Sequence, residues 1–131
     1  MTDSALSLLG LALRGSNLAV GEEPVADACK ARRAWLVMSA ADAAQNSVDR
    51  AGRMAELGGV PWVHIPWDKE ALGNALGRAT CAVAALTDRG LAAAFAAKLV
   101  QADESLRFTL ESLLNEKKKP RAQKKPAFRE I

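Results

Sequence analysis

Residues 15–30 read GSNLAVGEEPVADACK, and the rest of the chain is organised around them. Two glycines bracket the short apolar run 18–20, and the second of them, Gly21, stands where a helix begins in the sequence pattern. Glu22 and Glu23 fall in the first turn, where the helix dipole favours negative charge, and Pro24 tolerates its missing N–H there. The stretch therefore predicts a connector and a well-started helix. A second interpretation is a helix N-terminus presented to a polar ligand.

Length and composition indicate one domain that encloses a core. The chain has 131 residues, half of them hydrophobic, but only 5% are aromatic, so Ala, Leu and Val make up most of the predicted core. Neither a signal peptide nor a membrane span is expected from the sequence. Cys29 and Cys81 form no C-x-x-C pair and are expected to be reduced, buried thiols. These features predict a cytoplasmic protein.

The charge is unevenly distributed. Seven basic residues and one acid lie between Lys117 and Ile131, which gives that segment a net charge of +6 and leaves residues 1–116 with −3. We expect a single domain over 1–114 and a basic, disordered tail over 115–131. Such a tail is typical of proteins with polyanionic partners, although it can also serve only to solubilise the chain.

Hydrophobic periodicity predicts alternating helices and strands. Strands are expected over 18–20, 34–38, 60–65 and 81–86; helices are expected over 4–14, 22–31, from an N-cap at 46 or 47 to 57, over 69–76, and from 89 to 99 or beyond. Gly15 is expected to cap the first helix and Leu57 to face the core. Asp68 and Asp88 are expected to cap the last two helices. This order predicts an α/β fold, a three-layer α-β-α sandwich around a small mixed, partly parallel sheet.

Catalytic signals are weak. His64 is the sole histidine, so a metal triad would lack further histidine ligands, and because a lone residue seldom makes a site we expect a structural role for it. Neither cysteine has a basic neighbour in sequence. The glycines of Leu72-Gly73-Asn74-Ala75-Leu76-Gly77 lack the context of a dinucleotide site. We therefore expect no enzyme activity, no metal and no cofactor.

Several segments taken together resemble a known family. They are Leu8–Gly15, the Gly21-Glu22-Glu23 turn, Trp35–Asp42 with Asn46, Gly59–Pro61, Leu72–Gly77 and Cys81–Asp88. In their order they are similar to the bacterial YlxQ-like proteins of the kink-turn-binding ribosomal-protein superfamily (large-subunit protein seven-Ae type). The resemblance covers about residues 4–100. It implies an α-β-α sandwich that binds kinked structured RNA with one edge, and we expect a non-enzymatic monomer whose RNA is ribosomal.

The resemblance also implies where RNA would bind. The N-terminus of the second helix would face sheared G·A pairs, which assigns Gly21, Glu22, Glu23, Pro24 and Asp27 to the site. The loop before the last strand would pack against a flipped-out base. That loop contributes Arg78, Ala79 and Thr80. Lys30, Arg32 and Arg33 would add contacts to phosphate.

The sequence departs from the family pattern Gly-x-Asn-Glu-x-x-Lys. Glu23 stands at the Asn position, Pro24 replaces a polar residue, and Asp27 replaces the lysine that would face phosphate or base. A like charge about 4 Å from a phosphate costs on the order of 4 kcal/mol at partial shielding. Two hypotheses therefore remain: recognition of kinked RNA, or a protein-interaction module on the ribosome or transcription machinery.

Overall fold

The computed structural model describes residues 2–102, which form five helices and four strands. The helices are α1 (Thr2–Arg14), α2 (Glu22–Lys30), α3 (Gln45–Gly58), α4 (Lys69–Ala75) and α5 (Arg89–Ala102). The strands are β1 (Leu18–Val20), β2 (Leu36–Ser39), β3 (Trp62–His64) and β4 (Val83–Leu86). The tail expected over 115–131, and any continuation of the last helix, lie outside the described residues.

The four strands form one mixed sheet in the order β1-β4-β2-β3. β2 and β3 are parallel, with Val37 opposite Trp62, whereas β4 is antiparallel to both β1 and β2. All residues of β2 and β4 are buried, as expected of central strands covered on both faces. β1 and β3 are the edges of the sheet. The predicted small, partly parallel sheet is confirmed.

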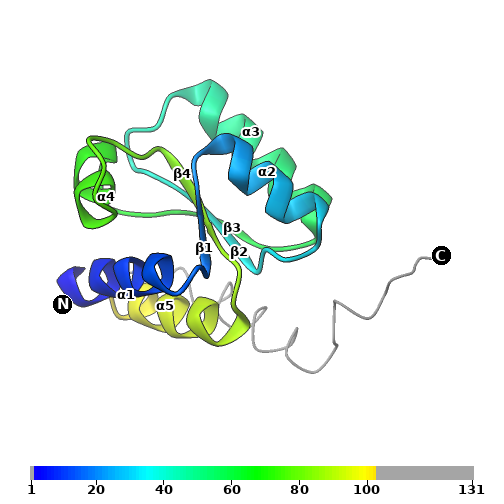
Figure 1. Ribbon diagram of the computed structural model, residues 1–131. Coiled ribbons are helices and arrows are strands. Elements are labelled where there is room, and N and C mark those ends of the chain that lie inside the picture. Colours follow the sequence, from blue (N-terminus) through cyan, green and yellow to red (C-terminus); the bar gives the residue numbers. More distant parts are fainter. Residues whose placement is uncertain (1, 103–131) are drawn as a thin grey trace.

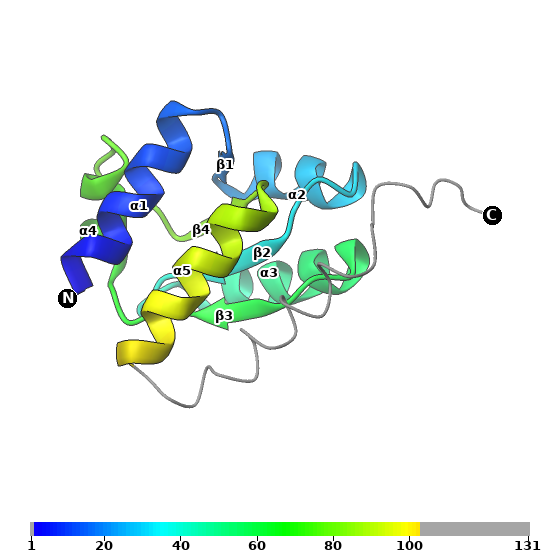
Figure 2. The ribbon, with the colours of Figure 1, turned by 90° about the horizontal axis from the view of Figure 1, so that it is seen from below.

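Helices cover both faces of the sheet, which confirms the three-layer sandwich. α2 and α3 lie side by side on one face, and α1 and α5 pack together on the other (Figures 1 and 2). α4 packs against α1. One buried cluster fills the space on the α1–α5 side and includes Leu9, Met38 and Phe95, while a smaller one on the α2–α3 side includes Val25, Cys29 and Ala51. The small side chains of this second cluster allow α2 and α3 to approach closely.

Most helix ends agree with the sequence pattern. Asp68 accepts a hydrogen bond from the Ala71 amide at 2.8 Å, and Asp88 accepts one from Leu91 at 2.9 Å, so both predicted caps are confirmed. Gly59 ends α3 in the left-handed conformation. Strands β3 and β4 are shorter than predicted, although beyond the ends of β3 the Pro61 carbonyl still accepts from the Val37 amide and the Ile65 amide still donates to the Ser39 carbonyl.

Two predictions at helix ends and faces are wrong, and for α1 the predicted cap residue Gly15 does follow the last helical residue but is not the left-handed one. α3 begins at Gln45 with Ala44 as its N-cap, because the Ser47 hydroxyl is bonded to Glu22 instead. The left-handed residue after α1 is Ser16, with φ of 63°, and Gly15 continues the helical hydrogen bonding to Leu11. Leu57 is 60% exposed rather than inward-facing, because it lies about 240° around the helix from Ala51 on the buried side.

Candidate functional site

Gly21 joins the start of α2 to the central strand β4. Its φ of 98° and ψ of 163° lie in a region of backbone space that is essentially restricted to glycine. In this conformation its N–H donates to the Val83 carbonyl at 2.9 Å, one residue beyond the β1–β4 ladder. The N-terminus of α2 is therefore fixed beside the beginning of β4.

The loop before β4, residues 77–82, is held closely against α4. A Cβ on Gly73 would lie 2.6 Å from the Thr80 Cα, so only glycine permits this approach. The Arg78 amide donates to the Gly73 carbonyl at 2.8 Å, and the Cys81 amide donates to the Lys69 carbonyl at 3.0 Å. The side chains of Arg78, Ala79 and Thr80 remain exposed. A fixed backbone thus presents three exposed side chains, and the loop leads directly into the strand that holds Gly21.

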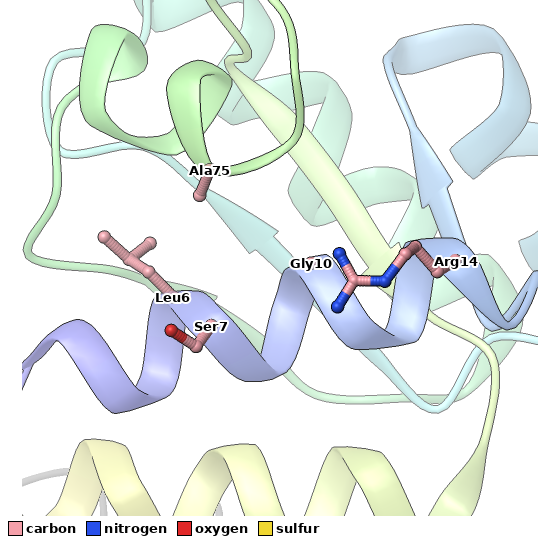
Figure 3. Close-up of a pocket in the computed structure, with 5 residues that line it drawn as sticks. All are labelled: Leu6, Ser7, Gly10, Arg14 and Ala75. Carbon is pink, nitrogen blue, oxygen red and sulfur yellow. The ribbon is translucent and has the colours of Figure 1, made fainter.

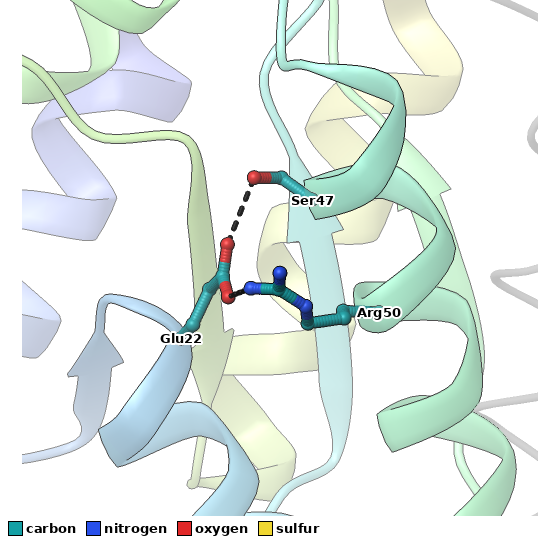
Figure 4. Close-up of polar contacts among 3 residues, drawn as sticks. All are labelled: Glu22, Ser47 and Arg50. Carbon is teal, nitrogen blue, oxygen red and sulfur yellow. Dashed lines mark hydrogen bonds and ion pairs between the residues drawn. The ribbon is translucent and has the colours of Figure 1, made fainter.

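Glu22 is occupied by α3. One carboxylate oxygen accepts a hydrogen bond from the Ser47 hydroxyl at 2.8 Å, and the other pairs with the guanidinium of Arg50 (Figure 4). The Ser47 hydrogen bond, followed by that of Arg50, lowers the pKa of Glu22 below its usual value. Both oxygens therefore have partners within the protein, and Glu22 is ionised at neutral pH.

The remaining predicted residues near Gly21 are on the solvent side of α2. Glu23, Pro24 and Asp27 are all exposed. Because Arg50 neutralises Glu22, the net charge beside Gly21 comes from Glu23 and Asp27, with Arg78 as the nearest cation of the loop. The structure brings the α2 N-terminus and the loop together, but it makes the α2 side of this surface acidic.

Lys30, Arg32 and Arg33 lie at the opposite end of α2. The nine residues of this helix span about 13 Å, so these cations are not part of the surface beside Gly21. Arg32 takes a left-handed φ of 61° and donates from Nη1 to the Gly58 carbonyl at 3.0 Å. Arg32 therefore connects the C-terminal ends of α2 and α3.

Sequence reasoning missed two residues of this region, Ser47 and Arg50. They lie 25 and 28 residues from Glu22, and no local pattern pairs them with it. Sequence reasoning did expect Cys29 and Cys81 to be buried thiols outside any disulfide, and both are. Burial raises the pKa of the Cys81 thiol, whose Sγ lies 3.4 Å from the Val83 carbonyl oxygen.

The aromatic residues lie at the border of the core. Trp35, Trp62 and Trp67 are each half-buried, and Trp67 packs against Phe95 with ring centroids 6.3 Å apart. His64 is exposed on the edge strand β3, with its ring 5.8 Å from that of Trp62. Trp62 donates its indole N–H to the buried Ser39 hydroxyl at 3.0 Å. These contacts give the residues structural roles.

A groove of about 500 Å³ separates α1 from α4. It is lined by Leu6, Ser7, Gly10, Arg14 and Ala75, and the Arg14 guanidinium extends over Gly10 (Figure 3). Within residues 2–102, no three side chains of His, Cys, Asp or Glu are close enough together to hold a metal ion. None of the helices in that range is long and apolar enough to span a membrane.

Comparison with known proteins gives consistent results. A protein of unknown function from Bacillus halodurans is 30% identical, with a TM-score of 0.65, over 71% of this chain and 93% of that one. The 15.5 kD RNA binding protein of Giardia lamblia is 26% identical, with a TM-score of 0.58, over 77% of this chain and 85% of that one. No curated protein sequence matches. Residues 3–94 match the ribosomal protein L7Ae/L30e/S12e/Gadd45 family, and the chain therefore belongs to that family.

Proposed function

We propose that this protein binds structured RNA, in particular ribosomal RNA, and recognises a kinked, kink-turn-like element of it. Within the family we place it with the YlxQ-like proteins, as a cytoplasmic, monomeric, non-enzymatic member. Family membership and the similarity to the Giardia lamblia RNA binding protein support RNA as the ligand. The basic segment 115–131 would add attraction that does not depend on RNA sequence.

The hydrogen bond from the Gly21 amide to Val83 carries the proposal. It holds the α2 N-terminus, whose free N–H groups attract polar and anionic groups, beside a loop with exposed Ala79 and Thr80. Single-stranded or bent RNA offers unstacked bases to such surfaces, and small side chains leave room for one. The two halves of the surface are thus adjacent and rigidly connected.

The charges determine which contacts this surface offers. Glu22 is already bonded to Ser47 and Arg50, so Glu23 is the exposed carboxylate that can accept hydrogen bonds from guanine N1–H and N2–H₂. Asp27 repels phosphate from the same helix face. We therefore propose that Glu23 recognises the edge of a base. Arg78 and the cations at the opposite end of α2 would contact phosphates.

The test compares a kink-turn RNA with a straight duplex of equal length across a salt series, using the full chain. We expect a preference of at least about tenfold for the kinked RNA. Asp27→Lys should increase that preference, because it replaces a repulsive charge by an attractive one. Glu70→Lys makes the same change in charge on α4 and should affect both RNAs equally. Equal, steeply salt-dependent binding of both RNAs by the wild type would overturn the proposal.

The exposed acids Glu23 and Asp27 support a second candidate function. A helix start with two exposed carboxylates and a proline suits a basic protein partner, as in a protein-interaction module on the ribosome or transcription machinery. In that case Glu23→Gln and Asp27→Asn together would abolish association with ribosomal particles and leave RNA binding unchanged. Loss of kinked-RNA preference on Glu23→Gln alone would favour the first proposal, because that substitution leaves the charge of Asp27 in place.

A further inference from the structure

The α2–α3 layer has opposite charges at its two ends. Its N-terminal end carries four acids and one base and has a net charge of −3: Glu22, Glu23, Asp27, Asp49 and Arg50. Its C-terminal end carries four bases and one acid and has a net charge of +3: Lys30, Arg32, Arg33, Arg53 and Glu56. The four bases, hereafter the basic end, are all exposed. The end that resembles the family's binding region is therefore the acidic one.

The separation of charge comes from α2 and the two residues that follow it, and parallel packing adds the cation Arg53 of α3 to the same end. At their starts Glu22 of α2 contacts Ser47 and Arg50 of α3. At their ends a Cβ on Gly58 would lie 3.2 Å from the Cys29 Cβ, and Arg32 donates to the Gly58 carbonyl. α2 and α3 thus run in the same direction, and both C-termini meet on one side of the molecule (Figure 1). Cations from both helices are brought to one surface.

The internal structure occupies only one of the four bases. Arg32 satisfies the Gly58 carbonyl at a helix end, which is a structural role. Among the described residues, the side chains of Lys30, Arg33 and Arg53 make no hydrogen bond or ion pair with one another or with any other group. A helix C-terminus favours a cation by 0.3–1 kcal/mol, roughly, within its last turn. Arg53 lies five residues before Gly58, outside that turn, so the helix dipole does not account for it.

We propose that the basic end is a second RNA surface, which binds backbone phosphates of the RNA whose bent part meets Gly21. This rests on the proposed function for the identity of the polymer, and it adds a separate place of contact. Three of the four bases are arginine, whose planar guanidinium matches phosphate oxygens in pairs. The α2 helix spans about 13 Å, so an RNA that runs along α2 from Gly21 needs to be only a few nucleotides long to reach the basic end.

This surface accounts for the acidic residues beside Gly21. Most of the phosphate attraction is assigned to the basic end, whereas recognition of a base edge is assigned to Glu23 at the start of α2. The exposed Leu57 lies in the last turn of α3, near these bases, and does not oppose phosphate electrostatically. An acidic protein segment with an apolar side chain would also suit this surface and Leu57. The experiment below separates that partner from RNA, because only an RNA surface predicts weaker RNA binding when the cations are removed.

The experiment uses the full chain with Lys30→Gln and Arg53→Gln combined, which removes one cation from each helix and leaves Arg32 in place. The matched control combines Arg89→Gln and Lys98→Gln, which removes the same charges from α5 on the opposite face. Binding of kinked and straight RNA is measured from low to physiological salt. Circular dichroism and thermal melting establish that both variants are folded.

We expect the Lys30/Arg53 variant to bind both RNAs about tenfold more weakly than the control. Its slope of log K against log[salt] should be smaller by about 1 to 2, because two phosphate contacts are lost. Its preference for kinked over straight RNA should not change. The ratio of the affinities for kinked and straight RNA tests the proposed function. If the wild type showed no preference for kinked RNA and the variant showed a smaller salt slope, kink recognition would be refuted and the basic end supported.

Equal affinity and equal salt slope in the variant and the control would overturn the basic end as an RNA surface, whether or not the wild type prefers kinked RNA. Absence of RNA binding by the wild type would overturn both proposals. Glu56→Gln provides an independent check, since removing the one acid there should strengthen binding two- to threefold and should not affect the kinked-to-straight ratio.

Discussion

The carboxylate of Glu22 pairs with the guanidinium of Arg50, 28 residues farther along the chain. Ser47 binds the second carboxylate oxygen from the preceding turn of α3. Because Glu22 follows Gly21 directly, this pair fixes the candidate RNA-binding edge of α2 relative to α3 (Figure 4). It also removes one carboxylate from the groups that could contact a ligand. The Arg50 side chain is 54% exposed, so its pairing with Glu22 remains sensitive to salt.

Glu22→Gln should make the stability of the protein less dependent on pH. The folded-state pKa of Glu22 is lowered, so its contribution is present above the ordinary value of 4.5 and is lost as pH falls through the lowered folded-state value. We expect a loss of about 0.5–1 kcal/mol at pH 7, since the pair is largely exposed. Urea denaturation of the wild type and of Glu22→Gln, at pH 7 and below pH 4, measures the difference in their free energies of unfolding. A difference from wild type that grows on acidification would contradict this assignment.

Gly73→Ala should destabilise the protein and disturb the 77–82 loop. The new Cβ would lie 2.6–2.7 Å from three Thr80 backbone atoms, so the loop or α4 must move. Overpacking of this kind costs about 1–3 kcal/mol. Gly52→Ala is the matched control, because that Cβ meets nothing within 4 Å in the interior of α3 and should stabilise by about 0.5–1 kcal/mol. Equal effects of the two substitutions in denaturant unfolding would refute the close contact.

The layers of the fold could be predicted from the sequence because they depend on local patterns. The run from Leu36 to Met38 indicated a strand buried on both faces, and Asp68 and Asp88 indicated helix starts. The exposure of Leu57 could not be predicted, because the small residues Ala51, Ala55 and Gly58 define the buried face of α3. The hydrophobicity of Leu57 predicted that its side chain would face the core, whereas it faces solvent.

The candidate site could be predicted only in part. Gly21 was identified because its role is set by its own backbone. The pairing of Glu22 with Arg50, and the use of Arg32 on the Gly58 carbonyl, depend on which helices pack together and in which direction. The sequence pattern does not contain that information. The order of charges along residues 22–33 is visible in the sequence, but the addition of Arg53 to the basic end depends on the packing of α3 against α2.

Cys81 should react slowly with thiol reagents in the native protein. It is 5% exposed, and burial raises its pKa, so the reactive thiolate is scarce and poorly accessible at neutral pH. We expect alkylation by iodoacetamide at pH 8 to be at least about tenfold slower than in urea. Cys81→Ser, which leaves Cys29 as the sole thiol, assigns the modified site by mass spectrometry. Rapid native modification of Cys81 would show that the loop before β4 opens.

Gly21→Asn should damage the fold and RNA binding together. With φ of 98° and ψ of 163°, Gly21 lies where an asparagine side chain is strained by about 1–3 kcal/mol. Relief of that strain would rotate the amide away from the Val83 carbonyl and detach the α2 N-terminus from β4.

Gly59→Asn separates this effect from the general consequence of replacing a glycine. Gly59 ends α3 with φ of 69° and ψ of 32°, the left-handed conformation that asparagine accepts at helix ends. We expect it to cost only a few tenths of a kcal/mol, roughly, and to leave RNA affinity unchanged. Denaturant unfolding and RNA titration of both variants measure the contrast. If Gly21→Asn were as mild as Gly59→Asn in both measurements, the Gly21–Val83 connection would not be what positions the RNA-binding edge.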